Sequence, residues 1–385
     1  MTTVWQDLVG QRPVVEVLQA AAAGHGMTHA WLFTGPPGSG RSNAALALAA
    51  ALQCERGTGC GECHSCHTVR TGSHADVTVI RTEKLSIGVE EVRHLVRRSA
   101  LAPSGDRWQV LVVEDSDRLT DQACNALLKT IEEPTPRTVW LLCAPTVEDV
   151  LPTIRSRCRL VTLTTPPAAE VAAFLVRTMG VPEPLAAHAA RASQGHIGRA
   201  RAIAGDEATR NRRNEVVRLA AQLTTLGAAM NAATNLHEVA KEEAAAITSE
   251  LDGREKSDLD AAYGVEERGR RPREYAAALK RLEDGQRTRA KRRVLDVVDR
   301  CLMDLVSVYR DAIALSVGVP GQLVNEEIRG DVAAVARAAS PEQLLRMIDA
   351  VFAAREQMLE FNVPPQLALE SMTLALRLTP ERRVS

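Results

Sequence analysis

The sequence predicts an α/β fold in which helices cover a mostly parallel sheet, followed by a region that is helical throughout. Apolar, strand-like runs alternate with helical stretches over residues 1–163, which is typical of βαβ units. No strand-like run follows residue 205. Aromatic residues make up only 3% of the chain, which favours helix packing over a β-sandwich. A chain of 385 residues is long enough for two or three domains.

Four apolar runs are predicted to form the strands of the sheet, at residues 30–35, 108–117, 138–145 and 159–164. Helical stretches follow the first two runs, at residues 42–53 and 121–133. Strands that alternate with helices pair in parallel and are buried on both faces. Ligands of such sheets bind at the carboxyl ends of the strands. A glycine-rich stretch and an acidic pair fall at this edge.

The rest of the chain is predicted to form two helical domains. Residues 164–205 form a small one, and residues 206–385 form an all-helical one with amphipathic helices at 289–313, 341–358 and 364–378. Residues 241–293 are dense in charge and poor in large apolar side chains. One interpretation of this stretch is a solvated helical extension or flexible loop. The other is a regulatory or DNA-contacting arm.

Charge and hydropathy exclude two classes of protein. The formal net charge of −1 argues against a large basic face that wraps DNA, and leaves room only for a local patch. No run approaches the ~18 consecutive apolar residues of a membrane-spanning helix. The N-terminus lacks the basic-then-apolar layout of a signal peptide. We therefore expect a soluble, cytoplasmic protein without a membrane partner.

The stretch TGPPGSGRS, residues 34–42, differs by one residue from the phosphate-binding pattern G-x-x-x-x-G-K-[ST]. Its glycines let backbone N–H groups converge on an anion, and the next helix adds the positive end of its dipole. Ser42 stands where a hydroxyl binds Mg²⁺, but Arg41 replaces the lysine and cannot take its position. The sequence therefore predicts a P-loop in which ATP or ADP with Mg²⁺ can bind but hydrolysis is impaired. The predicted nucleotide-binding residues are Gly35, Pro36, Pro37, Gly38, Ser39, Gly40, Arg41, Ser42, Glu114 and Asp115.

Glu114 and Asp115 form the acidic pair at the end of the second predicted strand. An Asp-Glu pair at this place normally holds Mg²⁺ and orients the attacking water. Here the order is reversed, and a carboxylate misplaced by about an ångström costs on the order of 100-fold in rate. Two interpretations stay open: solvated carboxylates at a strand end, or a residual metal site.

Four of the eight cysteines cluster within residues 54–66, and they are Cys54, Cys60, Cys63 and Cys66. In a reducing cytosol such a cluster is better explained by a metal than by disulfides. Two C-x-x-C steps suit tetrahedral Zn²⁺ with Zn–S distances of about 2.3 Å, and four cysteines leave no position for water. The sequence therefore predicts a structural zinc site. The alternative is four unligated thiols, which would be prone to oxidation.

Three arginines begin the last predicted strand: Arg155, Arg157 and Arg159. An arginine at a domain edge can act as a finger that reaches the nucleotide of a neighbouring subunit. Spacing alone favours ordinary surface arginines.

The motifs together resemble the bacterial DNA polymerase III clamp-loader AAA+ subunits. The phosphate loop, the four-cysteine insert, NALLKTIEEP (125–134) and RSRC (155–158) follow one another in the family's order, and NVPPQLALESMTLAL (362–376) is similar to the end of its collar. The resemblance implies an AAA+ core at 1–163 with a zinc module at 54–66, a small helical lid at 164–205, and an oligomerising collar at 206–385. It also implies a non-polymerising subunit of the holoenzyme, with motor (tau/gamma) and delta subunits, the sliding clamp and primed DNA as partners.

Within this family one member is the ATP-hydrolysing motor and another is a stator with a degenerate site. This sequence departs from the motor pattern at four places: Arg41, the inverted Glu114-Asp115 pair, Ala144 at the sensor-1 position, and Gly198 at the sensor-2 position, where Arg199 is adjacent. Ser156, Arg157 and Cys158 match intact, so Arg157 is the expected finger in trans. The alternatives are an active ATPase motor subunit and a free-standing zinc protein that binds nucleic acid.

Overall fold

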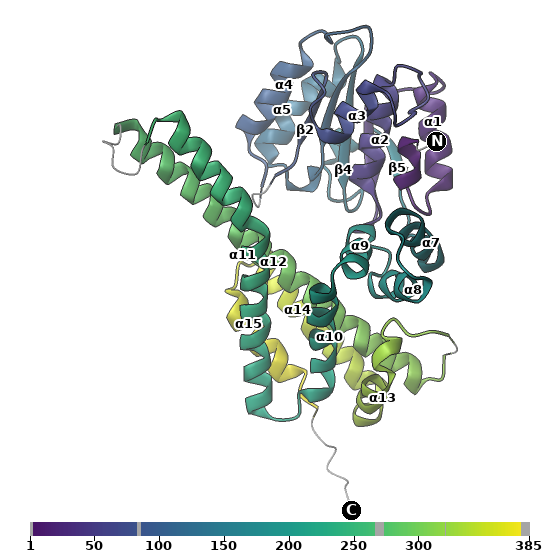
Figure 1. Ribbon diagram of the computed structural model, residues 1–385, viewed down its shortest axis with the longest axis vertical. Helices are drawn as coiled ribbons and strands as arrows, with labels where there is room; N and C mark the ends of the chain where they lie inside the picture. Colours follow the sequence, from purple (N-terminus) through teal and green to yellow (C-terminus); the bar gives the residue numbers. More distant parts are fainter. Residues whose placement is uncertain (1–2, 83–85, 266–272, 320, 379–385) are drawn as a thin grey trace, which may run out of the picture. The chain divides into compact units, whose positions relative to one another are not determined.

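The structure of the chain is a computed structural model that describes residues 3–82, 86–265, 273–319 and 321–378. The chain forms two compact units, Met1–Asp206 and Glu207–Ser385, each considered by itself (Figure 1). Over the described residues, none of the helices combines the length and the apolar character needed to cross a membrane.

The first unit is built on a five-stranded parallel sheet with the strand order β2-β3-β4-β1-β5. The strands are β1 (Ala30–Thr34), β2 (Val77–Ile80), β3 (Gln109–Val113), β4 (Thr138–Ala144) and β5 (Arg159–Thr162). The four predicted strands are confirmed, each within a few residues of its expected bounds. Strand β2 was not predicted, because it is only four residues long and Thr78 interrupts its apolar run.

Both faces of the sheet are buried because successive side chains of a strand point to opposite sides. In β1, Trp31 and Phe33 lie in the apolar core under α1 (Arg12–Ala22), α2 (Arg41–Gln53) and α3 (His64–Thr71). Ala30 and Leu32 lie in the opposite core, with α4 (Val89–Ser99), α5 (Asp121–Glu132) and α6 (Pro152–Arg155). Full burial of a side chain such as Leu32 stabilises the fold by about 1.5–3 kcal/mol.

Three further helices complete the first unit: α7 (Ala168–Met179), α8 (Glu183–Ala192) and α9 (Ile197–Gly205). They pack around a core of their own that includes Phe174 and Leu175. The segment leading to them is tied to the N-terminal part by Gln11, whose Nε2 donates to the Thr164 carbonyl at 2.6 Å. The Gln11 Oε1 accepts from the Thr164 N–H at 3.2 Å. We keep the separate lid domain at 164–205 as a proposal, since these helices and the sheet form one compact unit.

The second unit is helical throughout its described residues. Its helices are α10 (Glu207–Gln222), α11 (Leu226–Ala262), α12 (Arg273–Ser316), α13 (Arg329–Ala338), α14 (Pro341–Leu359) and α15 (Pro365–Ala375). Local sequence sets where they begin: the Thr225 hydroxyl accepts from the Ala228 N–H at the start of α11. Ser340 and Gln343 form a capping box before α14. One large apolar core holds the helices together.

Helices α11 and α12 pair as a long antiparallel hairpin whose outer part extends past the other helices of this unit (Figure 1). The charged residues 241–293 lie in this hairpin and are helical over 241–262 and 273–293, with a turn at 263–264; residues 266–272 lie outside the described residues. Polar contacts join the two helices: Arg289, only 7% exposed, binds Asp252 and Glu255, and Arg300 binds Glu243 at 2.6 Å. Ion pairs therefore add to the packing of buried side chains such as Ala244 and Tyr275 between these helices.

Candidate functional site

The predicted phosphate loop lies between β1 and α2, at the carboxyl end of the sheet. Gly38 has a φ of +82°, which favours glycine, and a Cβ there would lie 2.2 Å from the Cγ and 2.5 Å from the Cα of His196. The His196 backbone therefore lies directly against the loop, and the Ile197 N–H donates to the Gly38 carbonyl at 3.4 Å. The N-terminal end of α9 thus packs on the loop.

Arg41, the residue in place of the P-loop lysine, is the first residue of α2. Burial lowers the pKa of its guanidinium, and the carboxylates of Asp117, Asp115 and Asp149 act in the opposite direction. Its Nη1 is buried and makes no hydrogen bond to any described residue. The guanidinium is thus held by nearby negative charge at the carboxyl end of the sheet.

Glu114, the first member of the acidic pair, directly follows β3 and is engaged by Arg81, which directly follows β2. Arg81 Nε donates to Glu114 Oε2 at 2.8 Å, and Arg81 Nη2 donates to Oε1 at 2.9 Å. The Glu114 side chain is 8% exposed and that of Arg81 67%. The interpretation of Glu114 as a solvated carboxylate is therefore wrong. A metal ion here would have to displace a bidentate ion pair.

The two predicted sensor positions carry no polar side chain. Ala144 is the last residue of β4 and is buried. Gly198 is the second residue of α9, and the adjacent Arg199 donates its backbone N–H to His196 Nδ1 at 3.2 Å, which caps the helix. Within the loop itself, residues 34–42, Arg41 is the one charged residue.

The three arginines predicted near β5 have different surroundings. Arg159 lies over the Trp31 ring, 4.9 Å from its centroid, and donates to the Gly26 carbonyl. Arg155 is exposed. Arg157 is half-exposed and binds Glu132, the last residue of α5, with 2.6 Å between Nη2 and Oε1. Its Nη1 also donates to the Thr153 carbonyl at 2.7 Å and to the Ser156 hydroxyl at 3.2 Å.

Cys158, the last residue of the RSRC motif, is half-buried against the apolar core of α4 and α5. Burial raises the pKa of its thiol to about 12. The thiol is therefore protonated at neutral pH and serves packing rather than nucleophilic chemistry.

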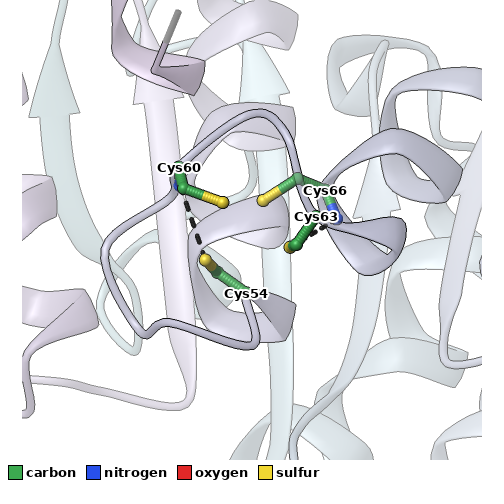
Figure 2. Close-up of side chains that lie close together, drawn as sticks. All are labelled: Cys54, Cys60, Cys63 and Cys66. Carbon is green, nitrogen blue, oxygen red and sulfur yellow. Dashed lines mark hydrogen bonds between the residues drawn. The ribbon is translucent and has the colours of Figure 1, made fainter. Parts of the chain in front are cut away.

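The four clustered cysteines converge, as Figure 2 shows. Cys54 ends α2, Cys60 lies in the connecting loop, and Cys63 and Cys66 stand at the start of α3. Their sulfur atoms all lie within 4.8 Å of one another. Tetrahedral coordination at about 2.3 Å requires sulfur–sulfur distances of about 3.8 Å, which a small contraction provides. The cluster is therefore a preformed set of ligands for a metal ion.

Backbone hydrogen bonds reach two of these sulfurs and favour the thiolate of Cys54, whereas burial raises the pKa of the Cys66 thiol. Cys54 Sγ accepts from the Cys60 N–H at 3.4 Å, and Cys63 Sγ accepts from the Cys66 N–H at 3.5 Å. Burial raises the pKa of the Cys54 thiol, but the N–H groups of Cys60, Arg56 and Thr58 outweigh it and bring this pKa down to about 6. A thiolate is the form that binds metals.

Comparison with known proteins identifies the family of the chain. The family described as "DNA polymerase III, delta subunit" matches residues 10–167, and "DNA polymerase III, delta subunit, C terminal" matches residues 298–377. Together the two matches cover more than half of the chain. The chain belongs to the DNA polymerase III delta-subunit family. Residues 168–297, which include most of the hairpin, lie outside both matches.

Relatives of the family share 36–38% identity with the chain. The delta' subunit of Escherichia coli K12 is 36% identical over 198 residues, which are 50% of this chain and 59% of that protein. The delta' subunit of Yersinia pestis is 38% identical over 159 residues, covering 40% and 44%. The gamma/tau subunit of Mycobacterium tuberculosis H37Rv is 36% identical over 155 residues, covering 39% and 27%. The chain thus spans 27–59% of the length of these relatives.

Two solved structures of related description are similar over nearly the whole chain. A DNA polymerase III gamma subunit-related protein of Thermotoga maritima has 14% identity, covers 94% of this chain and 98% of its own, and gives a TM-score of 0.42. The Bacillus subtilis DNA clamp loader delta protein has 13% identity, covers 94% and 99%, and gives a TM-score of 0.31.

Sequence reasoning missed three residues that contact predicted site residues: Arg81, His196 and Glu132. Arg81 follows β2, the strand that was not predicted. Without that strand, nothing in the sequence indicates that Arg81 lies beside Glu114. His196 precedes the sensor-2 glycine, but its contact with the loop joins segments far apart in the chain. Glu132 lies inside NALLKTIEEP, and the motif itself was the signal that could have singled it out.

Proposed function

We propose that the chain is the delta-prime (stator) subunit of the DNA polymerase III clamp-loader complex, with little or no ATPase activity of its own. The observation that carries this proposal is the bidentate pair of Arg81 with Glu114, at 2.8 and 2.9 Å. In an active P-loop ATPase the carboxylates after this strand hold Mg²⁺, which bridges the phosphates and neutralises the developing charge. Here an arginine of the same chain already neutralises Glu114.

The other substitutions support the same conclusion. Mg²⁺ has no free carboxylate at Glu114, which is paired, and the charges of Asp115, Asp117 and Asp149 act on the Arg41 guanidinium. Ala144 and Gly198 offer no sensor side chain. An active motor subunit, which the gamma/tau relatives would suggest, needs all of these groups. Any ATP held by residues 35–42 would therefore stay unhydrolysed.

Arg157 supports a role in trans. It is half-exposed and fixed by its own chain, whereas Arg159 is used in packing against Trp31. An arginine finger stabilises the charge of the transferring phosphoryl group. In GTPases this raises kcat on the order of 10³–10⁵-fold. We propose that Arg157, supported by Ser156 and Cys158, completes the ATP site of a neighbouring motor (tau/gamma) subunit. Motor and delta subunits are the expected partners, in the cytoplasm, and the complex loads the sliding clamp on primed DNA during replication.

The decisive experiment measures ATP hydrolysis by the isolated chain and by the reconstituted complex. We expect no turnover above background for the isolated chain, and a complex whose ATPase falls when it contains Arg157→Ala. Arg155→Ala is the matched control, because Arg155 is an exposed arginine of the same turn. Turnover by the isolated chain would favour the motor subunit. An unchanged ATPase with Arg157→Ala would exclude the finger.

We propose structural Zn²⁺ as the metal of the four-cysteine cluster. Four thiolates suit tetrahedral Zn²⁺ and leave no open position for catalysis. Metal analysis of the purified chain should find about one zinc ion per chain, and Cys60→Ser should lower this value. A free-standing zinc protein that binds nucleic acid is disfavoured by the net charge of −1 and the few aromatic side chains.

A further inference from the structure

Arg157 is held from three directions. Its Nη2 binds Glu132 Oε1 at 2.6 Å, and its Nη1 donates to the Thr153 carbonyl at 2.7 Å and to the Ser156 hydroxyl at 3.2 Å. Thr153 and Ser156 belong to α6 and its cap, whereas Glu132 ends α5. The guanidinium therefore bridges two helices that share a core, and its plane is fixed rather than swinging on a flexible stem.

These contacts leave part of the guanidinium open to a partner. Arginine carries five N–H donors, and the Nε–H of Arg157 donates to none of the described residues. The side chain is still 38% exposed. A phosphate oxygen presented by a neighbouring subunit can thus bind without displacing Glu132.

The value of the pair with Glu132 is not in folding stability. The two side chains are 38% and 44% exposed, and ion pairs in solvent contribute about 0–1 kcal/mol. Its value is in orientation: an arginine side chain loses up to about 2 kcal/mol of rotamer entropy when it is fixed. A finger that is already oriented does not lose this entropy when the transition state forms.

We infer that Glu132 is a positioning residue, which holds the Arg157 guanidinium in the orientation that meets the polyphosphate of a nucleotide bound to the adjacent subunit. This inference rests on the proposed role of Arg157 in trans. Glu132 does not touch the nucleotide, and its effect passes entirely through Arg157.

Four single variants of this chain, each reconstituted into the complex, test the inference by kcat and KM for ATP. Glu132→Ala should lower the Arg157-dependent part of kcat about tenfold with KM unchanged, because a misplaced group weakens the transition state and not substrate binding. Glu132→Gln keeps an oxygen that can accept the Nη2–H and should retain most of kcat. Glu133→Ala is the matched control, since Glu133 is the adjacent exposed carboxylate and pairs with no described arginine. Arg157→Ala sets the lower limit.

The double variant Glu132→Ala with Arg157→Ala separates positioning from any independent role. If Glu132 acts only through Arg157, the double variant equals Arg157→Ala, because coupled residues are not additive. A double variant slower than Arg157→Ala, or Glu132→Ala at or above the wild-type rate, would overturn the inference. If Arg157→Ala itself has no effect, the proposed role of Arg157 in trans fails. If only Glu132→Ala has no effect, the proposed function stands and the inference alone fails. Equal melting temperatures of the variants confirm that each is folded.

Discussion

Arg81 covers the Glu114 carboxylate from the end of β2, and the two side chains differ strongly in exposure, 67% against 8%. Removal of Arg81 leaves a buried carboxylate without its bidentate donor, while water still reaches the place that Arg81 occupied. We therefore expect Arg81→Ala to lower the free energy of unfolding by about 1–2 kcal/mol, less than for a fully buried pair. Urea unfolding of the purified chain measures the change.

Two further variants control that measurement. Arg93→Ala removes an exposed partner of Glu90 and should change stability by less than about 0.5 kcal/mol. Adding Glu114→Gln to Arg81→Ala removes the uncompensated charge and should restore at least half of the loss. Equal stabilities of Arg81→Ala and Arg93→Ala would contradict the assignment of Glu114 as a buried, paired group.

Gly38 and Gly40 separate backbone strain from a steric contact. Both have a positive φ, +82° and +98°, but a Cβ on Gly40 meets nothing within 4 Å, whereas one on Gly38 meets His196. Gly40→Ala should lower the free energy of unfolding by about 1–2 kcal/mol through φ alone. Gly38→Ala should cost about 1–3 kcal/mol more, because the His196 backbone has to move. Equal losses in urea unfolding would mean that α9 does not pack on the loop.

At the scale of elements, the four-cysteine cluster includes residues of a helix that buries few side chains. Helix α3 is eight residues long, and only Cys66 and Val69 are buried. Isolated helices of this length are marginal in water. We expect chelation of the metal to raise hydrogen exchange over residues 55–72 while β1 stays protected. Cys124→Ser, outside the cluster, should retain the metal; unchanged exchange after complete chelation would refute a structural role.

The hairpin of α11 and α12 depends on charge. The hydrogen bond from Arg289 holds the pKa of Glu255 below its ordinary value of 4.5. A lowered pKa in the folded state gives stability that is complete above the unfolded pKa and is lost as the pH falls through the folded one. The protection factors of the α11 amides, which correct for the intrinsic pH dependence of exchange, should therefore fall below about pH 4.5, the ordinary value for Glu. Arg289→Ala should lower them already at pH 7 and flatten their pH dependence. Arg287→Ala, exposed on the same helix, should do neither.

Local patterns explain which elements could be predicted. The strands were found because burial on both faces makes them continuous apolar runs, as in Val110–Val113. The cysteine cluster was found because its ligands lie within thirteen positions of one another. Arg81 with Glu114 and Glu132 with Arg157 were not, since the partners are 33 and 25 residues apart and only the sheet and the packed helices bring them together. The charge density of residues 241–293 did not decide between a helical extension and a flexible loop. Ion pairs such as Arg289 with Asp252 form only when the two helices are aligned in one register, which the sequence does not show.

At the scale of the molecule, the chain divides between Asp206 and Glu207. Each unit has its own buried core, so fragments 1–206 and 207–385 should each unfold cooperatively when expressed alone. A fragment of residues 1–163 is the informative comparison. It loses Thr164, the partner of Gln11, and the α7–α9 core that covers Val9, so it should be less stable than 1–206. Circular dichroism during urea unfolding measures all three. A fragment 1–163 as stable as 1–206 would support an independent lid.

The pair of Arg81 and Glu114 also has an evolutionary consequence. A change of Arg41 back to lysine leaves Glu114 covered, so it restores no metal site and offers selection no activity. Loss of Arg81 alone leaves Glu114 as a buried, unpaired carboxylate, which lowers the stability of the fold without restoring hydrolysis. Each single step toward a motor is therefore neutral or harmful, so hydrolysis is reached from this sequence only when Arg41 and Arg81 change together.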